Sequence, residues 1–389
     1  MSGAFDAYRR SQVAIAALFC CLGFQYATWV SRIPALKTRL DLSEAELGLL
    51  LMVCGAGAAV SFPLVAILTR RLGSRRLAIL SALGLGAVLL ALSVTPDYPV
   101  TLLIVFCDGV AVGCLNVAMN AQAAALEVKY RRTTMARMHA TFSAGSLFAA
   151  LLASGVTSLS SALPAHFATA TVLVVLLVLG ARGGLLSEAP EPDRQDEPAA
   201  PKRRGLTLPT RVTIWMGLAM AFGTVTEGAM NDWSALYLKD TAGAAAELAP
   251  LGIAVVSVMM VLARIFADGW RTKWGDDRIV RAGSALAGTG LALALLAGGV
   301  VPALIGFACV GLGIAAVTPC VYVAAARQGP DALALVAALG TTGLLAGPAV
   351  IGFIANGSSL AWGMGAVAAS ALVVSLCATQ IRFPALTEA

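Results

Sequence analysis

Apolar runs of about 20 residues, separated by short polar breaks, recur along the whole chain. A helix needs about 20 consecutive apolar residues to cross the hydrocarbon core of a bilayer. Each run is therefore predicted to be a membrane-spanning helix, and the first six runs cover residues 12–30, 46–69, 77–95, 100–126, 138–161 and 164–181. After a polar segment come six more, at residues 212–238, 249–270, 279–298, 302–326, 332–355 and 358–379.

The polar segment between the two sets of runs is rich in proline and charge. Acidic residues and prolines alternate between positions 188 and 198, and a basic triplet follows at 202–204. Such a composition cannot bury enough apolar surface to form a packed core. We therefore predict an all-α integral membrane protein with twelve transmembrane helices in two six-helix, pseudo-symmetric halves. The halves are residues 1–181 and 212–389, and residues 182–211 form a cytoplasmic linker.

The composition agrees with this class and excludes a soluble protein. Hydrophobic residues make up 59% of the chain and charged residues 12%, with a mean hydropathy of +0.84. Soluble domains carry roughly a quarter charged residues. The apolar run that begins near residue 13 has no small-residue cleavage site after it, so the first helix is expected to remain in the protein. A lipid bilayer is accordingly the first predicted partner.

The basic residues report the orientation of the chain. With the N-terminus inside, nearly all of the 27 lysines and arginines fall on the cytoplasmic side, and this bias sets orientation in membranes. We predict a multi-pass protein of the bacterial inner membrane with both termini in the cytoplasm. The net charge of +6 lies in these short breaks, so no nucleic-acid partner is expected. The basic residues placed elsewhere are Arg32, Lys37, Arg39, Lys239 and Arg264.

Several chemistries have no counterpart in this sequence. All eight cysteines lie inside apolar runs, where they behave as small hydrophobic residues, so we expect no disulfide, no metal site and no cofactor. A phosphate-binding loop is missing, which argues against transport driven by ATP. The only histidines, His139 and His166, form no metal-binding pair, which argues against an intramembrane enzyme.

The two predicted halves repeat each other weakly. The sequence at residues 70–73 has its counterpart at 272–275, and both segments end in glycine. Trp29 and Trp233 are related by nearly the same offset, near the outer ends of the first helix of each half. This agreement in position supports two related six-helix halves, and substrate sites in such proteins lie between the halves.

The architecture resembles the major facilitator superfamily over essentially the full length of the chain. The loop at residues 70–76, basic and with a turn glycine at Gly73, is similar to the signature between helices 2 and 3 of that superfamily. The resemblance implies a gating role for Arg70, Arg71 and Gly73. However, Arg70 occupies the position of the signature's acidic residue, so the gating ion pair ascribed to that acid is not implied here.

Three strings resemble a sparsely characterised bacterial branch of the superfamily that is distantly similar to fucose-permease-type sugar transporters. They are residues 116–122, 138–143 and 227–234. In that branch the position of Asn116 is usually Asp, so one potential proton carrier is replaced in this chain.

Ionisable residues inside the predicted helices are candidates for proton coupling, because a lone charge at the centre of a membrane helix costs roughly 2.5 to 3.5 kcal/mol. Glu227, midway along helix 7, is the first candidate, and the alternative is a protonated carboxyl that joins two helices. Asp108 in the outer half of helix 4 serves either as a proton entry point or as a water-exposed structural group. His139 begins helix 5, where it either relays protons or caps a loop.

Neighbouring polar residues are candidates for binding a solute. Asn116 and Asn120 share one helix face, and their amides can bind a polyhydroxylated ligand or simply join helices. Gln25, Tyr26 and Trp29 combine groups that stack on sugars and bind hydroxyls, although Trp29 also fits an interfacial aromatic belt. Residues expected further out than Glu227, lining an outer vestibule, are Asn231 and Asp232.

Two further features suggest moving parts. Arg264 and Asp268, four residues apart in helix 8, are predicted to pair as a conformational latch or as a static contact. Gly347 and Pro348 weaken the backbone of helix 11 and allow it to bend.

Together these features predict a monomeric secondary transporter that uses rocker-switch alternating access and is driven by protons, with Na⁺ left open. A sugar-like or polyol solute is favoured. The alternatives are export of amphiphilic drugs or metabolites by proton antiport and, further off, a membrane receptor or scaffold that transports nothing.

Overall fold

The computed structural model describes residues 2–130, 134–187, 210–381 and 383, and all regular secondary structure in this part of the chain is helical. The first six helices in chain order are α1 (Ser2–Val30), α2 (Ile33–Leu40), α3 (Glu44–Val94), α4 (Tyr98–Tyr130), α5 (Met135–Leu159) and α6 (Leu163–Ala181). The remaining helices are α7 (Arg211–Asp240), α8 (Leu251–Trp274), α9 (Asp276–Ala297), α10 (Val300–Ile314), α11 (Val317–Arg327), α12 (Pro330–Gly357) and α13 (Leu360–Ala378).

The twelve predicted spans are all present. Ten stretches are long and apolar enough to cross a membrane, and an eleventh, the shorter apolar stretch Leu251–Ala267, lies in α8. Two of the ten lie in α3, because that helix turns back on itself, and a single stretch runs through α10 and α11. The twelfth span is α7, whose polar residues in the middle of the helix lower its hydropathy. One element was not predicted: the short helix α2, which follows α1 directly.

The turn inside α3 lies at Gly73, the expected turn glycine. Its φ of 74° and ψ of 158° belong to a region that is essentially restricted to glycine. Gly275, its predicted counterpart between α8 and α9, has φ 82° and ψ 153°. The weak sequence repeat therefore corresponds to one backbone turn used in both halves of the protein.

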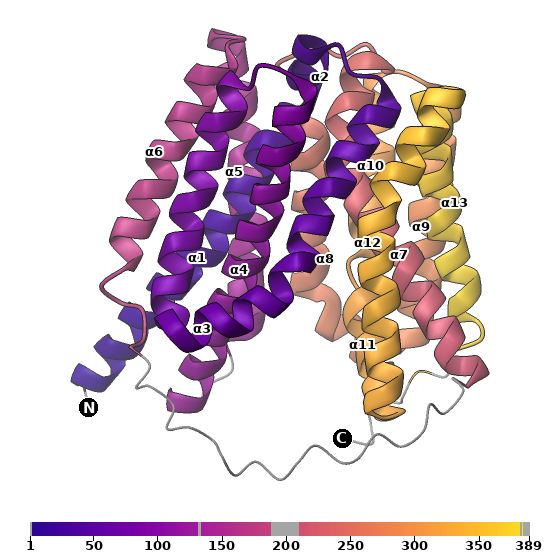
Figure 1. Cartoon of the computed structure of the whole chain (residues 1–389). Coiled ribbons are helices and arrows are strands. Elements are labelled where there is room, and N and C mark those ends of the chain that lie inside the picture. The colour runs from indigo at the N-terminus through magenta and orange to yellow at the C-terminus, as the bar shows by residue number, and fades with distance from the viewer. Residues whose placement is uncertain (1, 131–133, 188–209, 382, 384–389) are drawn as a thin grey trace.

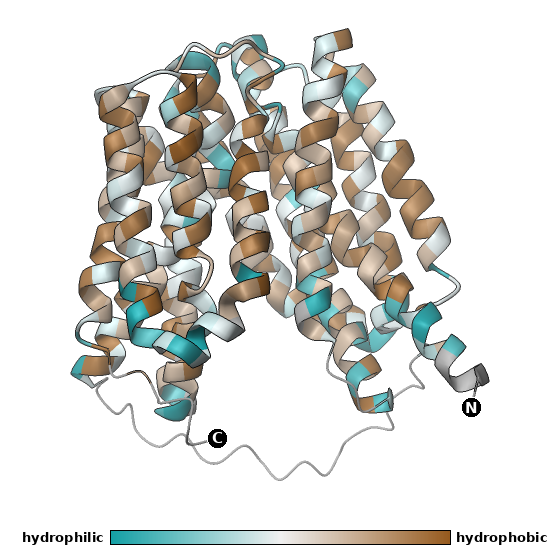
Figure 2. Cartoon of the chain, turned by 180° about the vertical axis from the view of Figure 1, so that it is seen from behind, coloured by the Kyte–Doolittle hydropathy of each residue, from teal (hydrophilic) through white to brown (hydrophobic). Residues whose placement is uncertain are grey.

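The helices form two groups that meet along the middle of the molecule (Figure 1). Helices α1 to α6 lie on one side and α7 to α13 on the other. The start of α1, the end of α6, the start of α7 and the end of α13 share one end of the bundle, which is called the linker end below. Figures 1 and 2 show the two groups of helices converging at the opposite end, here called the far end, and spreading apart at the linker end.

The convergence at the far end depends on small residues. A Cβ atom on Gly352 of α12 would lie 2.5 Å from the Glu44 carbonyl oxygen of α3, and one on Gly48 would lie 2.8 Å from the Pro348 carbonyl oxygen. These helices belong to different halves, so their backbones touch where the halves meet. Pro348 is a proline inside α12, as predicted, and it lies at this crossing.

The outer surface of the bundle suits lipid. Figure 2 shows apolar residues along the middle of the helices, with hydrophilic residues gathered mainly towards their ends. Large apolar side chains such as Leu159 and Leu296 are almost fully exposed. Because this surface would be unfavourable in water, the bilayer is the environment in which the fold is stable.

Replacing Gly275 by alanine is expected to destabilise the protein. A side chain in this backbone region costs about 1–3 kcal/mol, and the new Cβ would lie 3.0 Å from Asp277 Oδ1. The midpoint of thermal unfolding in detergent should therefore fall. Gly269→Ala is the matched control, because a Cβ at this exposed position in α8 meets nothing within 4 Å. An equal midpoint for the two variants would contradict the assignment of the turn.

Candidate functional site

Two consecutive residues of α1 hold one carboxyl group from each half of the protein. Gln25 Nε2 donates a hydrogen bond of 2.8 Å to Asp108 Oδ1 on α4. Tyr26 OH donates a hydrogen bond of 2.5 Å to Asp232 Oδ1 on α7. The second of these bonds crosses between the halves. The structure thus brings together four of the residues that the sequence predicted separately for proton coupling and for solute binding.

This cluster is enclosed. Asp108 and Gln25 are fully buried, and Asp232 is 5% exposed. The expectation that Asp108 is open to water does not hold in this conformation, and neither does the placement of Asp232 along an open outer vestibule. No lysine or arginine side chain in the described part of the chain forms an ion pair with either carboxyl. A charge held in this way costs several kcal/mol unless a proton or a cation neutralises it.

Glycines bring α4 close enough to α3 to complete the cluster. A Cβ on Gly109 would lie 1.8 Å from the Cys54 carbonyl oxygen, so α4 can pack here only without a side chain at this position. The contact places the Cys54 thiol 3.6 Å from Asp108 Oδ2. Cys54 also lies within electrostatic reach of Asp232. Sequence reasoning missed Cys54, although the run of glycines at 55, 57, 109 and 113 indicates close packing of these helices.

The two tryptophans related by the repeat are buried, and each lies within a few residues of a cluster residue along the chain. Trp29 and Trp233 are among the most completely buried large side chains of the protein. The ring of Tyr26 meets that of Trp29 edge-on, with 6.4 Å between the centroids. Neither indole N–H has a hydrogen-bond partner among the described residues. The Trp29 side chain is therefore packed inside the protein in this conformation and does not face lipid as a residue of an aromatic belt would.

A second polar group lies at the middle of α7 and α8. Arg264 Nη2 is 3.3 Å from Glu227 Oε1, and the two side chains are 38% and 31% exposed. Arg264 Nη1 is 3.4 Å from Ser143 Oγ on α5, in the opposite half. The partner predicted for Arg264, Asp268, has a side chain outside the described residues. The described partners of Arg264 are thus on other helices.

His139 and Asn231 lie near this second group, whereas Asn116 and Asn120 pair with each other on α4. His139 on α5 is exposed, packs edge-on against Phe19 and is close enough to Arg264 for their charges to interact. Asn231 Nδ2 donates a hydrogen bond of 2.9 Å to the Glu227 carbonyl oxygen.

The two asparagines of α4 contact each other. Asn120 Nδ2 donates a hydrogen bond of 2.9 Å to Asn116 Oδ1, and the Asn116 side chain is exposed. The amides of Asn116 and Asn120 therefore do share one face, as predicted.

The far end is closed by contacts that the sequence did not predict. Lys37 of α2 bridges Glu44 at 3.2 Å and Asp240 of α7 at 3.5 Å, and the second of these ion pairs joins the halves. Ser154 Oγ donates to the Glu247 carbonyl oxygen, again across the halves. Among the described residues, the polar contacts between the halves all lie at mid-depth or towards the far end.

At the linker end, by contrast, the described hydrogen bonds stay within one half. Arg75 binds the Arg182 carbonyl oxygen at 2.7 Å, and Arg271 binds Asp276 at 2.8 Å. The predicted gating residues Arg70 and Arg71 are exposed beside the turn at Gly73. This distribution of contacts describes a conformation that is closed at the far end.

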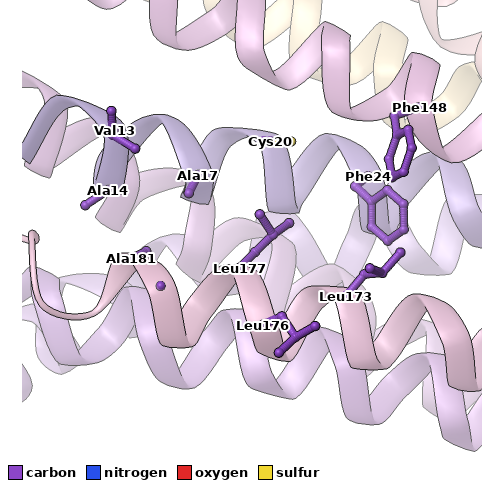
Figure 3. A pocket seen from close by; sticks show the side chains of 11 residues that line it. Val13, Ala14, Ala17, Cys20, Phe24, Phe148, Leu173, Leu176, Leu177 and Ala181 are labelled. Carbon is purple, nitrogen blue, oxygen red and sulfur yellow. The ribbon is translucent and has the colours of Figure 1, made fainter. Parts of the chain in front are cut away.

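An apolar groove of about 510 Å³ lies on another part of the molecule (Figure 3). It runs between α1, α5 and α6, and Phe24, Phe148 and Leu173 line one end of it. None of the predicted solute-binding or proton-coupling residues lines this groove. Its lining offers no group that recognises hydroxyls or charge.

Twelve spanning helices in two related halves, with polar side chains from both halves gathered between them, define the class of secondary membrane transporters. Residues 13–333 match the family model of the Major Facilitator Superfamily, and the chain belongs to this superfamily. An uncharacterized MFS-type transporter of Yersinia pestis is 34% identical over 95% of each chain. The membrane protein MosC of Rhizobium meliloti is 30% identical, over 89% of this chain and 84% of that protein.

Solved structures show the same fold. The nucleoside transporter NupG has a TM-score of 0.71 at 15% identity, over 96% of this chain and 98% of that one. The transporter FucP in its outward conformation has a TM-score of 0.60 at 17% identity, over 96% and 99%. These likenesses concern the fold, and they confirm the predicted two-half architecture of twelve helices.

The Tyr26→Phe variant is expected to shift the protein away from the conformation closed at the far end, because it removes a hydrogen bond that joins the halves. Spin labels on the exposed residues Asp41 and Ala245, in a background without native cysteines, should report a larger population of long distances. The matched control is Tyr98→Phe, which removes a bond to the Glu46 carbonyl oxygen within one half. Identical distance distributions for the two variants would show that Tyr26 does not hold the far end closed.

Proposed function

We propose that this protein couples the movement of protons to the transport of a small polar solute across the bacterial cytoplasmic membrane. Residues 1–181 and 212–389 rock against each other about the site between them, and residues 182–211 connect them on the cytoplasmic side. In this proposal the far end faces the exterior, because the basic residues of the breaks gather at the linker end.

The pairing of Gln25 and Tyr26 with two buried carboxyls carries the proposal. Asp108 bonds to a residue of its own half, whereas Asp232 bonds across to Tyr26. When the far end opens, the bond between Tyr26 and Asp232 must break, and water must reach both carboxyls. Opening and closing therefore change the cost of charge on these groups, which links conformation to proton binding.

A hydroxylated solute, such as a sugar or a polyol, is the favoured cargo. Side-chain amides both donate and accept hydrogen bonds, which suits hydroxyl groups. The pair of Asn116, which is exposed, and Asn120, which is partly buried, provides such groups, and Gln25 Oε1 is a buried acceptor without a partner among the described residues. Nucleosides, the solutes named for NupG, also carry hydroxyls and belong in the same class of candidates.

Export of an amphiphilic compound is the second candidate. The observation that favours it is the apolar groove between α1, α5 and α6, which has the volume for a small hydrophobic molecule. None of the residues of the carboxyl cluster lines the groove, so this function requires a route between them. The two functions differ in the ligands that bind the purified protein.

Thermal unfolding of the detergent-purified protein against sugars, polyols, nucleosides and lipophilic cations separates these candidates. A ligand at about 100 times its Kd stabilises the protein by roughly 2.7 kcal/mol. We expect a selective increase in the unfolding midpoint with a hydroxylated solute, and we expect Asn120→Ala to reduce it. An increase with lipophilic cations alone would support export, and would contradict the hydroxylated cargo.

The Asp108→Asn variant is expected to lose solute accumulation driven by a pH gradient in proteoliposomes, because an amide cannot exchange a proton. Counterflow of solute between two pools needs no proton cycle and should persist. Asp41→Asn is the matched control, since Asp41 is exposed in a left-handed conformation that asparagine also tolerates. Unchanged accumulation by Asp108→Asn would remove Asp108 from proton coupling.

A further inference from the structure

We propose that the solute carries a carboxylate and that Arg264 binds this group. The solute carboxylate then takes the place of the Glu227 carboxylate on Arg264. This inference rests on the proposed function and specifies its substrate as a hydroxylated carboxylic acid. It is carried by the geometry of the Arg264–Glu227 pair, by its exposure and by the groups around it.

Arg264 is a cation at an unusual place. It lies within the apolar stretch Leu251–Ala267 of α8, whereas the four arginines of α3 flank the turn at Gly73. Charged groups at this depth face the interior of a bundle or water rather than hydrocarbon, and they mark substrate pathways. With more than a third of its side chain exposed, Arg264 is reachable by a solute.

The pair with Glu227 is loose. A single contact of 3.3 Å joins Nη2 to Oε1, whereas the strongest arginine–carboxylate pairs form two parallel bonds of about 2.7–2.9 Å. The second contact, to Ser143 Oγ, is 3.4 Å long. The guanidinium group carries five N–H donors. Most of these donors therefore remain available for a solute carboxylate in the described structure.

The surroundings fit a carboxylate that carries hydroxyls. Ser143 on α5 offers a hydroxyl group, and Asn231 lies one turn from Glu227 on α7. His139 on α5, in the opposite half, is a titratable group close enough to Arg264 for their charges to interact. Binding at Arg264 would also engage both halves, because its two described partners lie on α7 and α5.

The exchange balances charge and protons. When the solute carboxylate takes the place of Glu227 on Arg264, the Glu227 carboxylate loses its counter-ion. A proton from the adjoining aqueous phase then binds a Glu227 oxygen and forms an O–H bond, so that the site gains one anion and one proton. On release of the solute, Glu227 returns the proton to water and pairs again with Arg264. Each carboxylate therefore moves with one proton.

Binding by the purified full-length protein tests this exchange. The probes are short hydroxycarboxylates, including gluconate, each paired with the alcohol in which CH₂OH replaces the carboxylate, such as sorbitol for gluconate. We expect at least one acid to bind at least about tenfold more tightly than its alcohol. Arg264→Lys, which keeps the charge but loses the two-pronged donor, should lose most of this preference. Arg278→Lys, at an exposed position in α9, is the matched control.

Glu227→Gln provides the second measurement. Titration calorimetry in two buffers of different ionisation enthalpy reports the protons taken up on binding. We expect the wild type to take up about one proton with the acid. Glu227→Gln should still bind the acid, at least as tightly, and should take up none. Proton uptake that persists in Glu227→Gln, or acids and alcohols that bind equally, would overturn the exchange.

The two proposals fail in different ways. Three results together would leave the proposed function standing and show the carboxylate exchange to be wrong. Neutral solutes would bind, Asp108→Asn would abolish their accumulation, and Arg264→Lys would leave their affinity unchanged. If no solute of either set binds the wild-type protein or is accumulated in proteoliposomes, then the proposed function itself is wrong, and the exchange with it.

Discussion

The cost of holding charge in a medium without water governs this structure. Hydrocarbon offers no hydrogen bonds, so each polar group inside the bundle must find a partner within the protein or face a hydrated space. Asp108 and Asp232 find theirs on consecutive residues of α1, and Glu227 finds Arg264. These few contacts decide how α1, α4, α7 and α8 are rotated about their axes, because a different rotation would turn a carboxyl towards lipid.

The two polar groups differ in a way that matters for transport. The cluster around α1 is enclosed, and its bond across the halves belongs to the closed far end. The Arg264–Glu227 pair is one-third exposed and loosely held. An enclosed group responds to conformation, whereas an exposed group can respond to a solute. A transporter needs both responses, and here they lie on one helix, since Glu227 and Asp232 are little more than one turn apart on α7.

Close backbone contacts join the two halves at the far end. At the far end, glycines on α3 and α12 let the two halves touch with little side-chain interdigitation. The polar contacts there, such as Lys37 with Asp240, are partly exposed, and exposed ion pairs contribute about 0–1 kcal/mol each. An interface made of backbone contacts at glycines and partly exposed ion pairs can separate without disrupting a large packed core.

The spans, the two halves and the turn glycines could be predicted from the amino-acid sequence, because hydropathy over a span and the backbone freedom of glycine are local properties. The sequence also singled out most of the polar residues, since a polar residue is conspicuous in an apolar run. Which of these residues contact each other depends on tertiary packing and could not be predicted. Gln25 and Asp108 lie 83 residues apart, and Arg264 contacts Glu227, which lies on another helix. The short helix α2 and the ion pairs of Lys37 likewise could not be predicted from the hydropathy pattern. Such pairings depend on how packing rotates each helix, and that rotation is a property of the whole bundle.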